Sequence, residues 1–175
     1  GRRLRGFYVS SIEIERSGEK IRVIIKTARP GMVIGRQGEG SVKLKNDIEK
    51  FTRKYNIPVK GLRVDIEEVR SPETDASVVA KMIAEGLEKR LPFRRVLKQT
   101  MDKIMANKKV LGARLAIAGR LGGAEMSRRE QIKNGMLPLQ TFRADIDFSR
   151  ERAVLPYGTI GIKVWIYKGE VFSEK

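Results

Sequence analysis

Residues 33–38 read Val33-Ile34-Gly35-Arg36-Gln37-Gly38, a Gly-x-x-Gly turn set between a strand-like and a helix-like stretch. Glycine adopts left-handed backbone conformations readily, and its missing side chain lets the backbone approach a phosphate closely. Arg36 would neutralise the charge of that phosphate. Because Gly-x-x-Gly also occurs in ordinary loops, the flanking chain must decide between a loop and a phosphate site.

The residues around this turn predict a small unit of strands and helices. Alternating apolar residues predict strands at 12–14, 20–26 and 62–66, the first two joined by a hairpin at Gly18. A long helix is predicted after Gly38, and its inward stripe comprises Leu44, Ile48, Phe51 and Tyr55. The order strand, strand, short helix, turn, long helix, strand is that of a KH module, which clamps about four nucleotides. The candidate RNA-binding residues here are Arg29, Gly35, Arg36, Gln37 and Gly38.

The second half of the chain predicts two helices packed on an antiparallel sheet. Ser71 is the expected N-cap of the first helix, with Pro72 in its first turn. The second helix is expected to run to about Asn107. Strands are expected near 115–117, 142–148 and 160–166, and a polar helix over 124–134. Residues predicted to face inward are Val79, Ile83, Leu87, Leu91, Leu97, Met101 and Ile104 on the helices, and Leu115, Ile117, Phe142, Ala144, Ile146, Phe148, Ile160, Ile162, Val164 and Ile166 on the strands. We therefore predict an α+β fold with domains 1–70 and 71–175.

The charge balance predicts a polyanionic partner. The chain carries 37 Lys and Arg against 21 Asp and Glu, a net charge of +16. Residues 1–70 hold 17 basic and 9 acidic side chains and residues 71–175 hold 20 and 12, so each half has a net charge of +8. Nucleic acid is the simplest partner of that kind. A membrane surface is the alternative, but no apolar run approaches the ~18 residues that span a bilayer.

The composition also removes most enzyme chemistry. The chain has no cysteine and no histidine, so disulfides, thiolate nucleophiles, imidazole bases and His-containing zinc sites are excluded. Gly35 and Gly40 have the spacing of a phosphate-loop nucleotide site, but Ser41-Val42 follow where Lys-Ser or Lys-Thr is needed. We predict no enzyme activity, no cofactor and no small-molecule substrate. No secretory signal is evident, so the cytoplasm is the expected compartment.

Two further basic clusters are candidate RNA contacts. At about 100° per residue, Arg94, Arg95 and Lys98 share one face of the second predicted helix. Residues 120–133 form a basic turn leading into the predicted polar helix, where Arg120, Arg128, Arg129 and Lys133 could cradle phosphates. The alternative for both clusters is a solvated surface with no partner.

Two weaker signals concern metal binding and base stacking. Asp145 and Asp147 have a spacing that could hold Mg²⁺ in a nuclease, but ion pairing with Arg143 or Lys163 is the favoured alternative, and we predict no metal site. Trp165 and Tyr157 could stack on bases, although core packing is the more common use of such residues.

Several blocks together resemble the family of bacterial-type ribosomal protein number three of the small subunit. They are Ile24 to Gly35, Leu91-Pro92-Phe93-Arg94-Arg95, Gly119 to Glu125, Phe142 to Asp147 and Gly161 to Ile166, in that order along the chain. The resemblance implies a type II KH domain followed by a two-helix plus antiparallel-sheet domain. It also implies a structural place in the head of the small ribosomal subunit. A non-ribosomal KH-type RNA-binding factor is the alternative function.

The resemblance further implies particular partners. They are the 3′ domain of the small-subunit rRNA, small-subunit proteins ten and fourteen, and mRNA in its entry channel. The cations of that channel would be Arg94, Arg95 and Lys98. The chain departs from the family in residues 129–133, where an aromatic pair is usual, and at Gly40-Ser41, which is expected to loosen the first turn of the KH helix.

Overall fold

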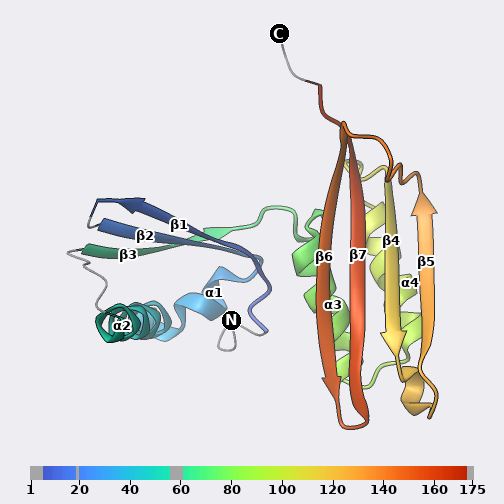
Figure 1. The fold of residues 1–175 in the computed structure, drawn as a ribbon, viewed down its shortest axis with the longest axis horizontal. Coiled ribbons are helices and arrows are strands. Elements are labelled where there is room, and N and C mark those ends of the chain that lie inside the picture. Colours follow the sequence, from blue (N-terminus) through green and yellow to red (C-terminus); the bar gives the residue numbers. More distant parts are fainter. Residues whose placement is uncertain (1–5, 19, 56–60, 173–175) are drawn as a thin grey trace. The chain divides into compact units, whose positions relative to one another are not determined.

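The computed structural model describes residues 6–18, 20–55 and 61–172, and the chain divides into two compact units, residues 1–70 and 71–175 (Figure 1). Both units combine helices with a sheet, which confirms the predicted α+β class. Within the described residues, no helix is both long enough and apolar enough to cross a membrane.

The first unit holds three strands and two helices in the predicted order. The elements are β1 (Val9–Ser17), β2 (Lys20–Thr27), α1 (Pro30–Ile34), α2 (Glu39–Lys54) and β3 (Gly61–Glu68). β2 pairs with β1 antiparallel and with β3 parallel. A parallel pair requires a crossover connection, and α1, the Gly-x-x-Gly turn and α2 form it. Both helices lie on one side of the sheet (Figure 1).

The core of this unit is small, and it covers only part of α2. Val9, Val23 and Ile25 are buried, with Leu44 and Ile48 of α2 packed against them. Phe51 and Tyr55 were predicted to face inward, which is wrong: each is 58% exposed, and their ring centroids lie 4.6 Å apart. A 16-residue helix is about 24 Å long, whereas three strands span only about 10 Å. The last turn is nevertheless partly covered, because Thr52 is buried; Phe51 and Tyr55 are exposed because they lie beside the buried face of α2.

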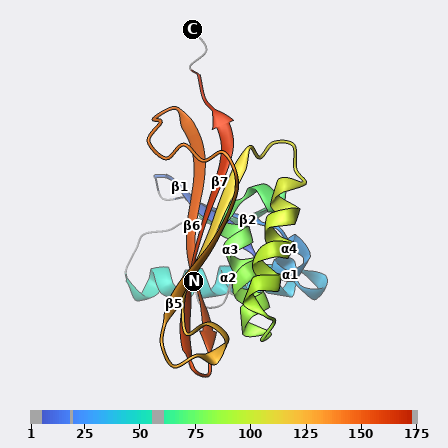
Figure 2. The same ribbon diagram turned by 90° about the vertical axis from the view of Figure 1, so that its right-hand side faces the viewer.

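The second unit packs two helices on a four-stranded antiparallel sheet. The elements are α3 (Ala76–Glu88), α4 (Phe93–Met105), β4 (Gly112–Gly119), β5 (Arg128–Gly135), β6 (Ala144–Leu155) and β7 (Gly158–Glu170), with strand order β5-β4-β7-β6. Both helices cover the same face of the sheet and leave the other face open (Figure 2). The predicted inward residues of the helices are buried, except Leu91, which lies beyond the end of α3 and is 47% exposed.

The polar helix predicted over residues 124–134 is wrong. A short 3-10 turn, Leu121–Gly123, leads instead into edge strand β5, in which Arg129 pairs with Ala118 and Ile132 with Leu115. An edge strand has one sheet neighbour, so most of its side chains reach solvent and only Ile132 packs on the core. The strand therefore lacks the alternating apolar residues by which strands are recognised.

The predicted cap of the first helix of this unit is also wrong. Ser71 begins a 3-10 turn, Pro72–Thr74, and makes no side-chain cap. Asp75 caps α3 instead, because its Oδ1 accepts hydrogen bonds from the amides of Ser77 at 2.9 Å and Val78 at 3.0 Å. Asp is as strong an N-cap as Ser, and its charge is favourable at the positive end of the helix.

The inward face predicted for residues 142–148 is wrong as well. Phe142 precedes β6 and is fully exposed. The buried residues of β6, Ala153 and Leu155, are odd-numbered, so strand alternation puts the even-numbered side chains on the opposite face. Phe148 consequently lies on the open face of the sheet, at 49% exposure. The core residues of β6 are farther along, at Ala153 and Leu155.

The two aspartates considered for a metal site differ in their contacts. Asp147 Oδ2 accepts a hydrogen bond from the Ala76 amide at 2.9 Å and pairs with Lys168 Nζ at 3.3 Å, whereas Asp145 is exposed. Among the described residues there is no group of three acidic, His or Cys side chains that could hold a metal ion. Asp147 therefore has a structural role: it attaches the start of α3 to β6.

We expect Asp147→Ala to lower the free energy of unfolding of the second unit by about 1–3 kcal/mol, because it leaves the Ala76 amide without its acceptor. Asp145→Ala is the matched control and should change that free energy by less than about 0.5 kcal/mol. Hydrogen exchange of the α3 amides measures both variants. Equal effects would show that Asp147 does not hold the helix.

Candidate nucleic-acid interface

The Gly-x-x-Gly turn has the backbone that its glycines allow. Gly35 and Gly38 have φ angles of +71° and +82°, and Gln37 between them has a φ of +51°. The Gly35 amide donates to the carbonyl oxygen of Gly31 at 3.0 Å, which closes α1. Arg36 and Gln37 are exposed on the turn that follows, and α2 begins immediately after Gly38, as predicted. The turn thus presents a cation next to the N terminus of a long helix, an arrangement that favours anions.

Gly40 has a role that the sequence did not reveal. A Cβ at this position would lie 2.3 Å from the carbonyl oxygen of Val33 and 2.9 Å from that of Ile34. The first turn of α2 therefore packs directly on the backbone of α1. Gly40 was expected to loosen the first turn of the helix, whereas in the structure only glycine permits this close approach of the two helices.

Beside the turn, the two helices and the start of the chain enclose a hollow of about 400 Å³. Its lining includes Phe7, Met32, Val33, Gly40 and Leu44, with lysines on α2 at its rim. Arg29 lies at the base of α1, where its guanidinium is 4.3 Å from the ring centroid of the buried Tyr8. Arg29 forms no ion pair among the described residues, so its stacking on Tyr8 is the contact that holds it.

The three cations of α4 project into solvent, as their helical phase predicted. Arg94, Arg95 and Lys98 are exposed, whereas Leu97, Met101 and Ile104 are buried. Arg94 shares the carboxylate of Glu130 on β5 with Arg128, at 3.3 Å and 3.6 Å. Both guanidiniums also lie over the ring of Phe93, within 5.6 Å of its centroid. Arg128 therefore joins the α4 cations in one cluster.

The basic residues from 120 to 133 do not form one surface. Side chains alternate along a strand, so Arg128 lies on the helix side of β5 while Arg129 and Lys133 lie on the open face. Arg120 contacts the chain itself: its guanidinium donates to the carbonyl oxygens of Ala124 at 2.9 Å and Tyr157 at 3.1 Å. Arg120 is therefore better placed to hold the 121–124 turn than to contact a ligand.

Elsewhere the protein neutralises its own cations. On the outer face of the first sheet, Arg22 pairs with Glu15 and Asp65, and Lys26 pairs with Glu13 at 2.5 Å. The hydrogen bond from Arg22 lowers the pKa of the Asp65 carboxyl and raises the pKa of Arg22 itself. This face is therefore close to neutral. The exposed cations of the turn and of α4, by contrast, keep most of their charge for a partner.

Comparisons with known proteins agree with both units. Residues 2–74 match the family model of the KH domain, and residues 83–166 match that of the ribosomal protein S3 C-terminal domain. Three relatives carry the name small ribosomal subunit protein uS3. The protein from Maridesulfovibrio salexigens is 50% identical over 168 residues, that from Clostridium botulinum 48% over 167, and that from Clostridium novyi 46% over 167. Each alignment covers 95% of this chain and between 72% and 75% of the relative.

We expect Gly40→Ala to separate α1 from α2, because its Cβ cannot fit beside the Val33 carbonyl. Overpacking of this kind costs about 1–3 kcal/mol. Hydrogen exchange of the α1 and α2 amides should accelerate accordingly. Gly31→Ala, where a Cβ would meet nothing within 4 Å, is the control and should leave exchange nearly unchanged. Equal protection in the two variants would contradict the close approach.

Proposed function

Because the chain belongs to the small ribosomal subunit protein uS3 family, a structural and non-enzymatic family, we propose that it is a constituent of the head of that subunit and binds RNA through both units. Residues 1–70 act as a type II KH domain and residues 71–175 as the C-terminal domain. The partners proposed for it are the 3′ domain of the small-subunit rRNA and small-subunit proteins ten and fourteen, in ribosomes of the cytoplasm.

The KH unit grips the RNA backbone at its Gly-x-x-Gly turn. The glycines at 35 and 38 allow backbone amides to approach phosphates, and Arg29 and Arg36 supply the positive charge. Gln37 offers a neutral donor and acceptor at the tip of the turn. The adjacent hollow beside Val33 and Leu44 is apolar enough to receive a base.

The observation that carries the mRNA part of the proposal is the cation cluster on α4. Arg94, Arg95 and Lys98 are exposed together, and among the described residues Arg95 and Lys98 form no ion pair. Held near an RNA channel, these side chains would attract any passing strand regardless of its sequence, because they read phosphates and not bases. They would hold mRNA at its entry channel. Any separation of strands there is passive, since no nucleotide-binding loop is present to power it.

A KH-type factor outside the ribosome, acting in RNA processing or subunit assembly, is the second candidate. It shares the evidence of the first unit. The match of residues 83–166 to the ribosomal C-terminal domain and the 95% coverage in the relatives favour the ribosomal constituent. Co-sedimentation separates the two, because a constituent remains with small subunits in high salt and a factor dissociates.

We expect changing Arg94, Arg95 and Lys98 to Ala to weaken binding of single-stranded RNA and to flatten its salt dependence. Each phosphate contact contributes about 0.7 to the slope of log K against log salt for single strands, so the slope should fall by about 2. The control changes Lys103, Lys108 and Lys109, which are also exposed, to Ala. Salt titrations of the purified proteins give the slopes.

The same variants should still assemble into small subunits. Co-sedimentation of each variant with subunits measures this, since the proposed rRNA contacts lie at other residues. Failure of the α4 variant to assemble would contradict a role confined to mRNA, and equal slopes in variant and control would contradict a phosphate-binding role for α4.

A further inference from the structure

The open face of the second sheet joins Arg129 and Lys133, which the sequence singled out, to further cations that no sequence motif connects with them. Strand register places three rows of side chains across β5, β4, β7 and β6. The rows are Lys133, Arg114, Trp165 and Phe148; then Gln131, Ala116, Lys163 and Arg150; then Arg129, Ala118, Gly161 and Arg152. Six of these twelve positions are Lys or Arg and none is Asp or Glu.

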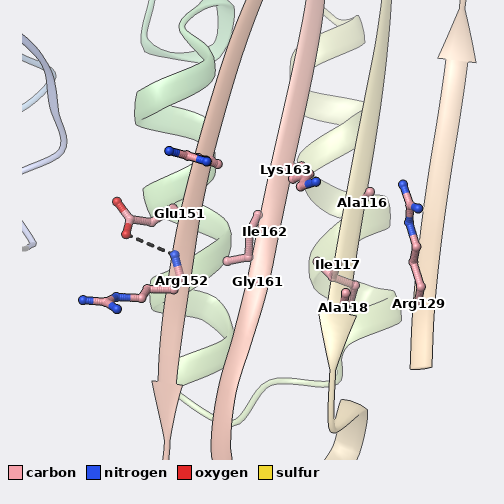
Figure 3. A pocket seen from close by; sticks show the side chains of 10 residues that line it. Ala116, Ile117, Ala118, Arg129, Glu151, Arg152, Gly161, Ile162 and Lys163 are labelled. Carbon is pink, nitrogen blue, oxygen red and sulfur yellow. Dashed lines mark hydrogen bonds between the residues drawn. The ribbon is translucent and has the colours of Figure 1, made fainter. Parts of the chain in front are cut away.

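The small residues in these rows create a trough between the cations. Ala116, Ala118 and Gly161 form the floor of a hollow of about 480 Å³, and Arg129, Arg150, Arg152 and Lys163 stand around it. Figure 3 shows Ala116 and Ala118 on β4, between Lys163 on β7 and Arg129 on β5. The helices lie behind the sheet, so this hollow opens on the face that they leave uncovered (Figure 3).

The charge of this trough is not neutralised from within. In the part of the chain that the structure describes, Arg129, Arg150, Arg152 and Lys163 form no ion pair. Glu151 also lines the hollow, and its Oε1 accepts a hydrogen bond from the Arg152 amide at 3.1 Å (Figure 3). On the outer face of the first sheet, by contrast, the cations are paired with carboxylates.

The Glu151 carboxylate also interacts with a lysine on the helix side of the sheet. Burial lowers the pKa of Lys81 on α3, and the nearby Glu151 carboxylate partly opposes that shift. Part of the Glu151 charge is thus balanced by a cation that does not belong to the trough.

An aromatic platform adjoins the trough at one end. The rings of Phe148 and Trp165 lie 5.2 Å apart on neighbouring strands, and the Arg114 guanidinium lies 5.2 Å from the Trp165 ring. Arg114 is held in place by a hydrogen bond to Gln131. Phe148 lies on the open face of the sheet and is 49% exposed. An exposed aromatic surface beside unpaired cations is the combination that single-stranded nucleic acid recognises.

We propose that this open face, formed by Arg129, Arg150, Arg152 and Lys163 with Phe148 and Trp165, is a second RNA site that takes one strand across the sheet. Phosphates lie over the cations of the trough, and a base stacks on the aromatic platform. The site is separate from the Gly-x-x-Gly turn and from the α4 cluster, which faces the helix side of the same unit. It deepens the proposed function, on which it rests, by naming a surface and a single-stranded form of RNA.

Charge and shape favour RNA over an acidic protein segment. An acidic peptide would satisfy the cations but would have no use for the platform, whereas a nucleotide supplies an anion and a flat π face together. A single strand fits better than a duplex, because bases paired inside a helix cannot reach Phe148.

The only tryptophan of the chain is Trp165, so its fluorescence reports on this site directly. We expect a twelve-nucleotide single-stranded RNA, titrated into the full chain, to quench Trp165. Changing Arg150, Arg152 and Lys163 to Gln should weaken the RNA affinity measured by quenching at least about tenfold and lower the salt slope by about 2. The control changes Lys103, Lys108 and Lys109 to Gln and should leave both quantities unchanged. Phe148→Leu should reduce the depth of quenching.

A glutamate peptide of twelve residues tests the competing partner. Quenching at an affinity equal to that of RNA would overturn the RNA assignment in favour of an acidic protein segment. Absence of RNA quenching, or equal affinities for the trough variant and its control, would overturn the site itself. Filter retention of RNA by the same proteins keeps the two proposals apart: retained RNA without quenching refutes only this site, and no retention refutes the proposed function as well. Unchanged circular dichroism shows that the variants fold.

Discussion

An excess of positive charge is the constraint on which this structure depends. With 21 acidic side chains against 37 basic ones, the chain cannot pair all of its cations, so the placement of its carboxylates decides where positive charge remains. Asp75 and Asp147 hold the start of α3, and Glu13, Glu15 and Asp65 neutralise the outer face of the first sheet. Among the remaining cations, three groups stand out, at the Gly-x-x-Gly turn, on α4 and on the open face of the second sheet.

The fold of each unit leaves these charged surfaces uncovered, because each unit packs its helices on one side of its sheet. The first unit has a short apolar core, and its two helices approach closely only because Gly40 has no side chain. The second unit has a larger core, which lies between its helices and its sheet. A two-layer unit of this kind leaves one complete sheet face for binding, which a three-layer fold would have covered.

Much of this architecture could be predicted from the sequence, because strand alternation and helical phase depend on local backbone geometry alone. Alternation at residues 20–26 and 62–66 reflects burial of one strand face, and the phase of Arg94, Arg95 and Lys98 follows from helix geometry alone. The errors concern positions set by distant partners. β5 is polar because it lies at a sheet edge, and Phe148 alternates with polar residues as a core residue would, although the helices cover the other face of β6. Phe51 is exposed because the polar Thr52 takes the buried position in the last turn of α2, which a pattern of apolar residues does not show.

The edge position of β5 also explains why its charges were hard to interpret. An exposed edge risks pairing with another chain, and charged side chains such as Arg129, Glu130 and Lys133 oppose that. β6 forms the other edge of the sheet and carries Arg150 and Arg152. The residues that protect two edges from aggregation thereby border the central trough with positive charge. One arrangement of cations thus both keeps the sheet from joining another sheet and attracts the polyanion that can cover its open face.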